Sequence, residues 1–326
     1  MIRALRTLLA LVIASLASGQ LKAGAIVAWG SDFWGAVSNV PSGNNFVAIA
    51  GGGPSGYALR SDGSIAAWGR NLEGQVSNVP LGNNFVTIAG GDFTGFALRA
   101  DGSIAAWGWD ASGQVSNVPS GTGFTAIAGG TKNGYALRSD GSIAVWGDNS
   151  WGQISNAPSG TGFVAIAAST FTGYGLRSNG SIVAWGNNDW GEVSTAPSAT
   201  NFTTLAAGNQ NGYAIRTNGS IIAWGNNNGS QVSNIPSGTN FIAIDGGDDA
   251  AFALRSNGSI AAWGLNLSNQ VSNTPNGSGF VAIAAGSDNG YALTGVPEPS
   301  SLMLLAVAGI GILARYRRKT SASRVA

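Results

Sequence analysis

A Trp-Gly dipeptide recurs every 39 residues through most of this chain, as from Trp29 to Trp68, without a single insertion or deletion. The residues before it, as in 56–69 (GYALRSDGSIAAWG), form two short apolar runs joined by Asp-Gly, which predicts a hairpin with a tight primed turn. Proline and phenylalanine keep the same interval, so the chain is a tandem array of one strand-rich unit. The three series are Trp29, Trp68, Trp107, Trp146, Trp185, Trp224 and Trp263; Pro41, Pro80, Pro119, Pro158, Pro197, Pro236 and Pro275; and Phe46, Phe85, Phe124, Phe163, Phe202, Phe241 and Phe280.

The two ends of the array indicate a closed ring rather than an open stack. The chain enters the array at Ile26–Trp29, a second hairpin arm, and leaves it at Tyr291–Leu293, a first arm. Seven full units counted from Ile26 would end at residue 298, whereas the repeat ends at 294, four turn residues short. Pairing of the two orphan arms would complete the last unit and leave no free sheet edge. The sequence therefore predicts an all-β fold, a seven-bladed β-propeller over residues 26–294 whose ring is closed by the N-terminal strand.

Each blade is expected to contain three strands. The run Phe46–Ala50 alternates large and small side chains before a Gly-Gly pair, which suits the innermost strand at a crowded axis. The two hairpin arms give the second and third strands. A short fourth strand around Gln153–Ser155 is left open, because the nearby Pro158 limits its length.

Composition excludes several kinds of site. The chain has no Cys and no His, so it offers no thiolate, no disulfide and no imidazole as base or metal ligand. The formal net charge of +1 conceals an uneven distribution, since residues 26–295 hold eight Lys/Arg against fourteen Asp/Glu, a charge of −6. An acidic body without a basic face repels phosphate backbones, so we expect no nucleic-acid partner.

Residues 1–25 have the layout of a secretory signal peptide. Arg3 and Arg6 precede the apolar run 8–17, which is too short to span a bilayer, and small residues follow. The triplet Ala23-Gly24-Ala25 fits the small-x-small cleavage rule, and Ala17-Ser18-Gly19 fits it less well. Export is therefore expected, and a retained anchor helix is the alternative.

The repeat consensus carries a family resemblance. The pattern Ala-Gly-Gly-x4-Tyr-Ala-Leu-Arg-Ser-Asp-Gly-Ser-Ile-Ala-x-Trp-Gly-x-Asn-x-x-Gly-Gln resembles the regulator-of-chromosome-condensation repeats, over residues 26–294. The compact unit is similar to the short-repeat bacterial branch that includes beta-lactamase inhibitory protein II. This resemblance implies a seven-bladed propeller with small blades and, more remotely, guanine-nucleotide exchange. Gly-Tyr or Gly-Phe stands here where the family often has His, which argues against nucleotide exchange.

Residues 295–326 resemble the PEP-CTERM sorting tail of Gram-negative bacteria. A motif at 296–299 precedes an apolar segment, expected to form a transmembrane helix over about 300–314, and a basic stop at 315–319. The resemblance implies that an exosortase-type enzyme processes the tail during transient insertion in the inner membrane, and that the protein reaches the cell surface or extracellular matrix. Basic residues after an apolar segment stay cytoplasmic, which would hold the propeller outside. An ordinary tail anchor is the alternative. The residues assigned to the sorting signal are Val296, Pro297, Glu298, Pro299, Arg315, Arg317 and Arg318.

One group of carboxylates departs from the repeat and is a weak candidate metal site. Asp245 stands where the other repeats have Ala, Asp248 and Asp249 follow it closely, and three carboxylates near Gly-Gly could hold a hard cation such as Ca²⁺. Their spacing matches no full calcium loop, so an acidic loop without metal is favoured. No cofactor is expected.

One group of tryptophans is a candidate partner surface. Trp34, Trp151 and Trp190 share one repeat offset, and Trp109 lies nearby in its own loop. They either pack between blades or form an exposed aromatic surface, in which uneven side chains on equivalent loops would select a partner. Packing is favoured, because the remaining repeats carry Glu73, Ser112, Gly229 and Ser268 at this offset, and the exposed surface is the alternative.

The repeated polar residues have structural explanations. The turn positions hold Asp or Asn, which favour tight turns. The arginines are expected to be solvated strand ends beside the turn carboxylates, and a ring of cations on one face is the alternative. The turn residues are Asp62, Asp101, Asp140, Asn179, Asn218 and Asn257, and the arginines are Arg60, Arg99, Arg138, Arg177, Arg216 and Arg255.

These observations favour a secreted or surface-displayed, non-enzymatic propeller that binds a protein or an extracellular polysaccharide. The alternative is a carboxylate-based hydrolase or lyase at the propeller channel. Catalysis is not expected, because the chain lacks His and Cys and has no convergent, non-repeating polar set outside Asp245–Asp249.

Overall fold

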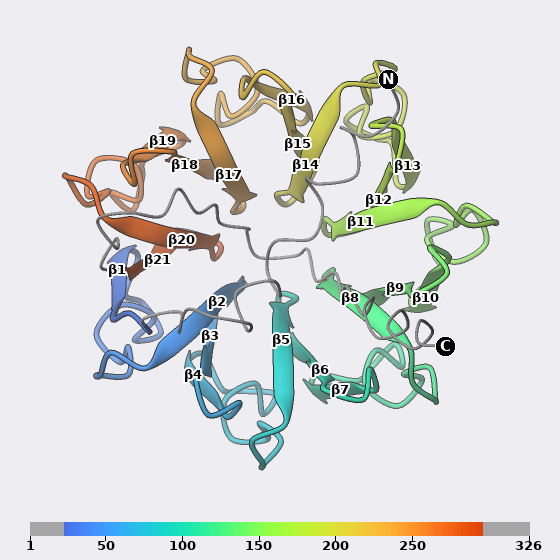
Figure 1. The fold of residues 1–326 in the computed structure, drawn as a ribbon, viewed down its shortest axis with the longest axis horizontal. Helices are drawn as coiled ribbons and strands as arrows, with labels where there is room; N and C mark the ends of the chain where they lie inside the picture. Colours follow the sequence, from blue (N-terminus) through green and yellow to red (C-terminus); the bar gives the residue numbers. More distant parts are fainter. Residues whose placement is uncertain (1–22, 296–326) are drawn as a thin grey trace, which may run out of the picture.

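The predicted propeller is confirmed by a computed structural model, which describes residues 23–295. In this part of the chain, 21 strands form seven three-stranded antiparallel sheets around one axis (Figure 1). No helix in residues 23–295 is long and apolar enough to cross a membrane. The expected signal helix and transmembrane helix fall on residues 1–22 and 296–326, which lie outside the described residues.

Each blade has an inner, a middle and an outer strand. The inner strands are β2 (Phe46–Gly52), β5 (Phe85–Gly90), β8 (Phe124–Gly129), β11 (Phe163–Ala168), β14 (Phe202–Ala207), β17 (Phe241–Gly246) and β20 (Phe280–Ala285). The middle strands are β3 (Ser55–Arg60), β6 (Thr94–Arg99), β9 (Asn133–Arg138), β12 (Thr172–Arg177), β15 (Asn211–Arg216), β18 (Ala250–Arg255) and β21 (Asn289–Thr294). The outer strands are β4 (Ile65–Gly69), β7 (Ile104–Gly108), β10 (Ile143–Gly147), β13 (Ile182–Gly186), β16 (Ile221–Gly225), β19 (Ile260–Gly264) and β1 (Ile26–Gly30).

The ring is closed by the N-terminal strand, as predicted. Strand β1 pairs antiparallel with β21, with Ile26 opposite Leu293 and Trp29 opposite Gly290. The Trp29 indole N–H donates to the Gln270 carbonyl, at a sequence separation of 241, whereas the equivalent Trp107 bond to Gln75 has a separation of 32. Seven repeats of 39 residues make a ring of 273 residues. Counted across the seam, the Trp29 bond therefore spans 273 − 241 = 32 positions, the same separation as in the other blades. The seam therefore has the same contacts as every other blade interface.

One pair of aromatic rings joins each blade to the next. In every repeat a middle-strand Tyr or Phe, at most 1% exposed, meets the outer-strand Trp of the following blade edge-on. The seven centroid distances lie between 5.2 and 6.1 Å, a range in which such pairs add about 0.5–1.5 kcal/mol beyond the buried area. In six of the seven blades the Trp indole in turn lies over a middle-strand glycine, and a Cβ on Gly134 would come within 2.1 Å of Trp146. The Tyr of a Gly-Tyr pair in one blade therefore packs against the Trp of a Trp-Gly pair in the next blade, which explains why both pairs recur in the sequence.

The hairpin turn differs in type from the prediction. We expected a primed turn with positive φ at both Asp and Gly, but only the glycine, as at Gly63 (φ 83°), has a positive φ. The Gly63 N–H donates to the Arg60 carbonyl and the Arg60 N–H to the Ser64 carbonyl, which gives a three-residue loop. This geometry is a type I turn followed by a left-handed glycine. Asp62 instead stabilises the turn by accepting the Ser64 N–H at 2.8 Å.

The possible fourth strand does not form. Residues Gln153–Ser155 lie in a turn region of the long loop between β10 and β11, and the Ile154 N–H donates to Asn149 Oδ1 rather than to a strand. Each blade in residues 23–295 therefore has three strands. The inner strands also carry a β-bulge that the sequence did not indicate, with a register shift after the leading Phe, as between Phe46 and Ala48.

Candidate binding face

The two ends of the propeller carry different loops. At one end, the loop face, the inner-to-middle connections meet the start of the long interblade loops, and the Arg70 N–H donates to the Pro54 carbonyl. At the other end, the turn face, the hairpin turns meet the end of the long loops, where the Ser61 N–H donates to the Asn45 carbonyl. Side chains that vary between repeats gather on the loop face.

The long loops are held by recurring short-range bonds, although the first of them has Ala36 at the position of Gln75. In the loop after β4, Asn71 Oδ1 accepts the N–H groups of Val76 and Ser77, each at 2.9 Å. Gln75 Oε1 accepts the Glu73 N–H, and the Gln75 carbonyl accepts the Trp107 indole N–H. Variable side chains on such loops are therefore presented from a fixed backbone, which suits recognition.

The exposed aromatic residues lie on neighbouring loops of the loop face. Trp34 is 38% exposed and Trp151 and Trp190 are each 45% exposed, whereas Trp146 in the blade interface is 4% exposed. Trp109 is half-buried. We call the following set the aromatic arc: Phe33, Trp34, Arg70, Phe93, Trp109, Lys132, Trp151, Phe171 and Trp190.

Alternating rings and cations connect the first part of the aromatic arc. The Arg70 guanidinium lies over the Trp34 ring at 5.5 Å and over the Phe93 ring at 4.6 Å. Phe93 meets Trp109 edge-on at 5.7 Å, and Lys132 Nζ lies 5.7 Å from the Trp109 centroid. These contacts cross blade boundaries, so a ligand that covers them would contact several blades at once.

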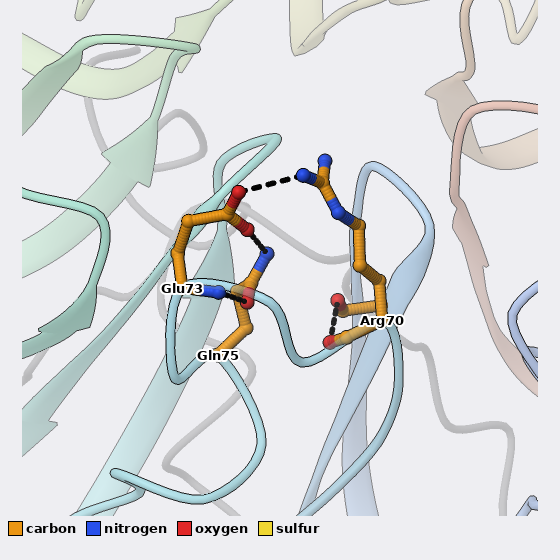
Figure 2. A network of polar contacts seen from close by, with 4 residues as sticks. Arg70, Glu73 and Gln75 are labelled. Atoms are coloured by element: carbon orange, nitrogen blue, oxygen red, sulfur yellow. Dashed lines mark hydrogen bonds and ion pairs between the residues drawn. The ribbon is translucent and has the colours of Figure 1, made fainter.

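Arg70 is fixed by a second network on its other side (Figure 2). Its guanidinium pairs with Glu73 Oε1 at 2.6 Å, and Gln75 Nε2 donates to Glu73 Oε2 at 2.7 Å. This is the one ion pair within residues 23–295. The pair holds the guanidinium between two aromatic rings, where a flexible side chain would otherwise sample many rotamers.

The mouth of the central channel, at the middle of the loop face, is acidic. Asp92, Asp245 and Asp248 line the channel mouth together with small residues and hydroxyls. Burial raises the pKa of Asp92, although the Thr131 hydroxyl donates to its carboxylate at 2.5 Å. Burial, reinforced by the charge of Asp92, raises the pKa of Asp248 to about 7, and burial raises the pKa of Asp245 to about 7.

The three candidate metal ligands do not converge. Asp245 faces the channel and accepts the N–H groups of Gly246 and Ala285, while Asp249 accepts Gln231 Nε2 outside the channel lining. Asp248 lines the channel mouth. Within residues 23–295 no group of three or more carboxylates is arranged to hold a metal ion.

The arginines of the turn face have a different environment from the one expected. Each guanidinium lies over the leading Phe of its own blade, 4.6–5.8 Å from the ring centroid, as Arg177 does over Phe163. None forms an ion pair with a turn carboxylate within the described residues. The expectation of no basic face was also wrong, because six arginines gather on the turn face against three aspartates, Asp62, Asp101 and Asp140.

Three members of the aromatic arc were missed by the sequence analysis. Phe93, Lys132 and Phe171 follow Pro54 at one repeat offset, and the same offset then gives Gln210, Asp249 and Asp288. Alignment of the seven repeats at this offset would have shown an aromatic and cationic sector followed by an acidic one. The other missed members, Phe33 and Arg70, join the arc through contacts between loops, which the repeat spacing alone does not reveal.

Solved structures share this fold. Yeast RCC1 (Prp20), crystallised with Kap60, is 16% identical with a TM-score of 0.69, over 86% of this chain and 90% of that chain. The CRINKLY WD40 ectodomain of the Arabidopsis thaliana receptor kinase ACR4 is 22% identical with a TM-score of 0.60, over 74% and 88%. Human WBSCR16 is 15% identical with a TM-score of 0.68, over 84% and 99%. Identities this low show likeness of fold alone, and no curated protein matches the sequence.

The fold is therefore a seven-bladed propeller like that of RCC1. Residues 295–319 match the model of the PEP-CTERM protein-sorting motif, which confirms the resemblance of the tail. The chain combines an RCC1-like propeller with a signal that implies exosortase-dependent sorting to the outside of the cell.

Proposed function

We propose that this protein is an exported, non-enzymatic scaffold whose loop face binds a protein or an extracellular polysaccharide. The observation that carries the proposal is the aromatic arc, in which Trp34, Trp151 and Trp190 keep between 38% and 45% of their surface exposed on rigid loops. Large rings fixed before binding lose little conformational entropy, and clusters of aromatic residues and arginine dominate binding energy in known interfaces.

The sorting motif supports an extracellular place of action. An exosortase-type enzyme would process the tail while its apolar segment is transiently inserted in the inner membrane of a Gram-negative bacterium. Strand β21 ends at Thr294, so cleavage near 296–299 would release a propeller with all of its strands. The product would then reside on the cell surface or in the extracellular matrix.

The alternative of a carboxylate-based hydrolase or lyase has one supporting observation. Asp245 and Asp248 have pKa values raised to about 7, a range suited to acid–base catalysis. However, both oxygens of Asp245 already accept backbone N–H groups, from Gly246 and Ala285. A carboxylate occupied in this way holds the channel wall together and is poorly placed to exchange protons with a substrate.

The test is a capture assay with the purified full chain and the extracellular polymer fraction of the source culture. We expect Trp34→Ser, Trp151→Ser and Trp190→Ser together to reduce capture at least about tenfold, since loss of an aromatic anchor costs on the order of 2 kcal/mol or more. Serine is the natural residue at this offset in two other repeats, at Ser112 and Ser268, so the loops should keep their conformation. Prior treatment of the polymer with protease or with glycosidase distinguishes a protein from a polysaccharide partner.

A matched control replaces an exposed apolar residue on the turn face. Leu81 is 98% exposed, and Leu81→Ser should leave capture unchanged. Equal capture by the triple variant and the parent would reject the aromatic arc as the binding surface. A triple variant that loses capture only because it unfolds at a lower temperature would assign the tryptophans to packing.

A further inference from the structure

The charge of the propeller is divided between its two faces. The turn face holds six arginines and three aspartates, a formal charge of +3. The other two cations, Arg70 and Lys132, and the other eleven carboxylates belong to the loop face and the channel, a formal charge of −9. A domain with a net charge of −6 therefore presents one cationic surface.

That surface is also asymmetric around the ring. In the first three blades the turn carries Asp62, Asp101 or Asp140, which offsets the arginine of the same blade. In the next three blades asparagine takes the same place and makes the same bonds, as Asn218 Oδ1 accepts the Ser220 N–H at 3.0 Å. Arg177, Arg216 and Arg255 consequently form an uncompensated cationic sector.

The described chain begins and ends on this same face. Thr294, the last residue of β21, pairs with Phe280 as the arginines of other blades pair with their own Phe, so it occupies the seventh arginine position. Gly24 exchanges backbone hydrogen bonds with Phe46 at the start of β2, on the same side. The sorting tail therefore departs from within the ring of arginines.

We propose that the turn face docks onto the anionic headgroups of the membrane into which the sorting tail inserts, with the sector of Arg177, Arg216 and Arg255 making the closest contact. The inference rests on the tail insertion proposed above and concerns the face opposite the aromatic arc. It would hold the loop face, and its partner site, away from the membrane.

The length of the connection supports a membrane as the occupant. The apolar run begins at Leu302, eight residues after Thr294, so the chain reaches at most about 28 Å between them. Charges interact over a Debye length of about 8 Å in physiological salt. A connection this short repeatedly brings the turn face within that distance of the lipid headgroups. Each lysine or arginine near an anionic surface contributes about 1 kcal/mol to binding. The guanidinium groups of Arg177, Arg216 and Arg255 stack on Phe rings, which leaves the N–H groups at their edges able to donate to phosphate.

The test uses the full chain reconstituted in vesicles and a single-cysteine reporter, which the absence of native Cys makes unambiguous. Ser178→Cys places a fluorophore on the turn face and Leu267→Cys places one on the loop face. A quencher on the lipid headgroup reports proximity to the membrane. We expect strong quenching of the Ser178 reporter in vesicles containing phosphatidylglycerol, weaker quenching in phosphatidylcholine alone or at high salt, and little quenching of the Leu267 reporter.

Two matched variants change only the charge of the turns. Asn179→Asp, Asn218→Asp and Asn257→Asp together bring the turn face to zero, and Asp62→Asn, Asp101→Asn and Asp140→Asn together bring it to +6. Each substitution copies a residue that the chain already uses at that turn. The ratio of docked to undocked protein should fall roughly a hundredfold in the first variant and rise in the second, at about fivefold per charge.

The possible failures are distinguishable. Flotation with phosphatidylcholine vesicles reports tail insertion alone, and a chain that does not float overturns the docking proposal together with the insertion. A chain that floats but shows equal quenching in both charge variants overturns the docking alone. Charge-dependent self-association of the full chain in detergent, measured by sedimentation, would instead assign the turn face to the acidic loop face of a second copy. Capture through the aromatic arc is unaffected by any of these outcomes.

Discussion

Replacement of Asp245 by alanine should stabilise the propeller at alkaline pH and destabilise it modestly in acid. Six of the seven repeats have alanine at this position, and the seventh places a carboxylate beside the channel. Burial raises the pKa of Asp245 from 3.8 to about 7, partly offset by hydrogen bonds from the N–H groups of Ala285 and Gly246. The sign follows from proton linkage: a raised folded-state pKa gives stability that is complete below pH 3.8 and lost as the pH rises through 7.

The magnitude follows from the size of this shift. A rise of the pKa from 3.8 to about 7 corresponds to about 4 kcal/mol against the ionised form, at about 1.4 kcal/mol per pKa unit. This is an upper value, because Asp245 keeps some surface toward the channel. The alanine variant loses two acceptors for backbone N–H groups, at a cost of about 1 kcal/mol each. We therefore expect Asp245→Ala to raise the unfolding free energy by about 2 kcal/mol at pH 8 and to lower it by about 1–2 kcal/mol near pH 4.

Urea unfolding at a series of pH values measures the effect. Between pH 4.5 and 6.5, Asp245 and Asp248 should each lower the unfolding free energy of the parent by about 1.4 kcal/mol per pH unit. The profile of the Asp245→Ala variant should be less steep by the share of Asp245. Ala206→Asp is the matched control, because it places a carboxylate at the same position one blade earlier and should destabilise only above its own raised pKa. Parallel pH profiles for parent and Asp245→Ala would refute the reasoning, since they would show that solvent in the channel hydrates the carboxylate.

Two further predictions concern backbone strain and the chain ends. Ser230 (φ 63°) and Asn269 (φ 58°) stand where the other repeats have a glycine of positive φ. Ser230→Gly should therefore raise the unfolding free energy by about 0.5–1 kcal/mol, measured by thermal unfolding. Asn269→Gly should change little, because asparagine tolerates this conformation, and equal gains at both sites would contradict the strain argument. The Gly24 N–H donates to the Phe46 carbonyl and the Ala25 N–H to Thr294 Oγ1, so sequencing should find a mature N-terminus at Gln20, after Ala17-Ser18-Gly19, rather than at Ile26. Mass spectrometry of the processed protein should place the C-terminus within 296–299, and an intact chain through Ala326 from a host with the processing enzyme would favour a simple tail anchor.

The fold could be predicted almost completely because the repeat length never varies. A repeat of 39 residues without insertions places equivalent residues in equivalent positions of every blade. The split hairpin at the two ends was therefore sufficient to predict the pairing of Ile26 with Leu293. The turn type and the β-bulge after Phe46 were not predicted, since Asp-Gly suits more than one turn and a bulge leaves no mark in a regular repeat.

The candidate site could be predicted only in part. The shared repeat offset of Trp34, Trp151 and Trp190 was found, but packing was favoured, whereas the structure leaves these side chains 38–45% exposed. Their use as a partner surface stays a prediction. The contacts of Arg70 with Trp34 and Phe93 join three different loops, and a single sequence does not state which loop side chains meet across blades. The cationic turn face was only the alternative for the six arginines, because the charge of the whole domain, −6, argued against a basic face.

Departures from the repeat are informative because every blade has the same neighbours. A side chain that the fold needs should therefore recur, and one that lowers stability without recurring needs another reason to persist. Glu192 shows this plainly: its Oε2 accepts the Trp190 N–H, as the glutamine of five other repeats does at the same offset, yet burial raises the pKa of its carboxyl. Glutamine would make the same bond without a buried charge. Glu192 and Asp245 are thus two carboxylates that the propeller does not require, and both lie on the loop-face side, beneath Trp190 or at the channel. We infer that selection acts there on recognition, whereas on the turn face the exchange of Asp for Asn between arginine-bearing turns changes the charge and leaves the turn bonds as they are.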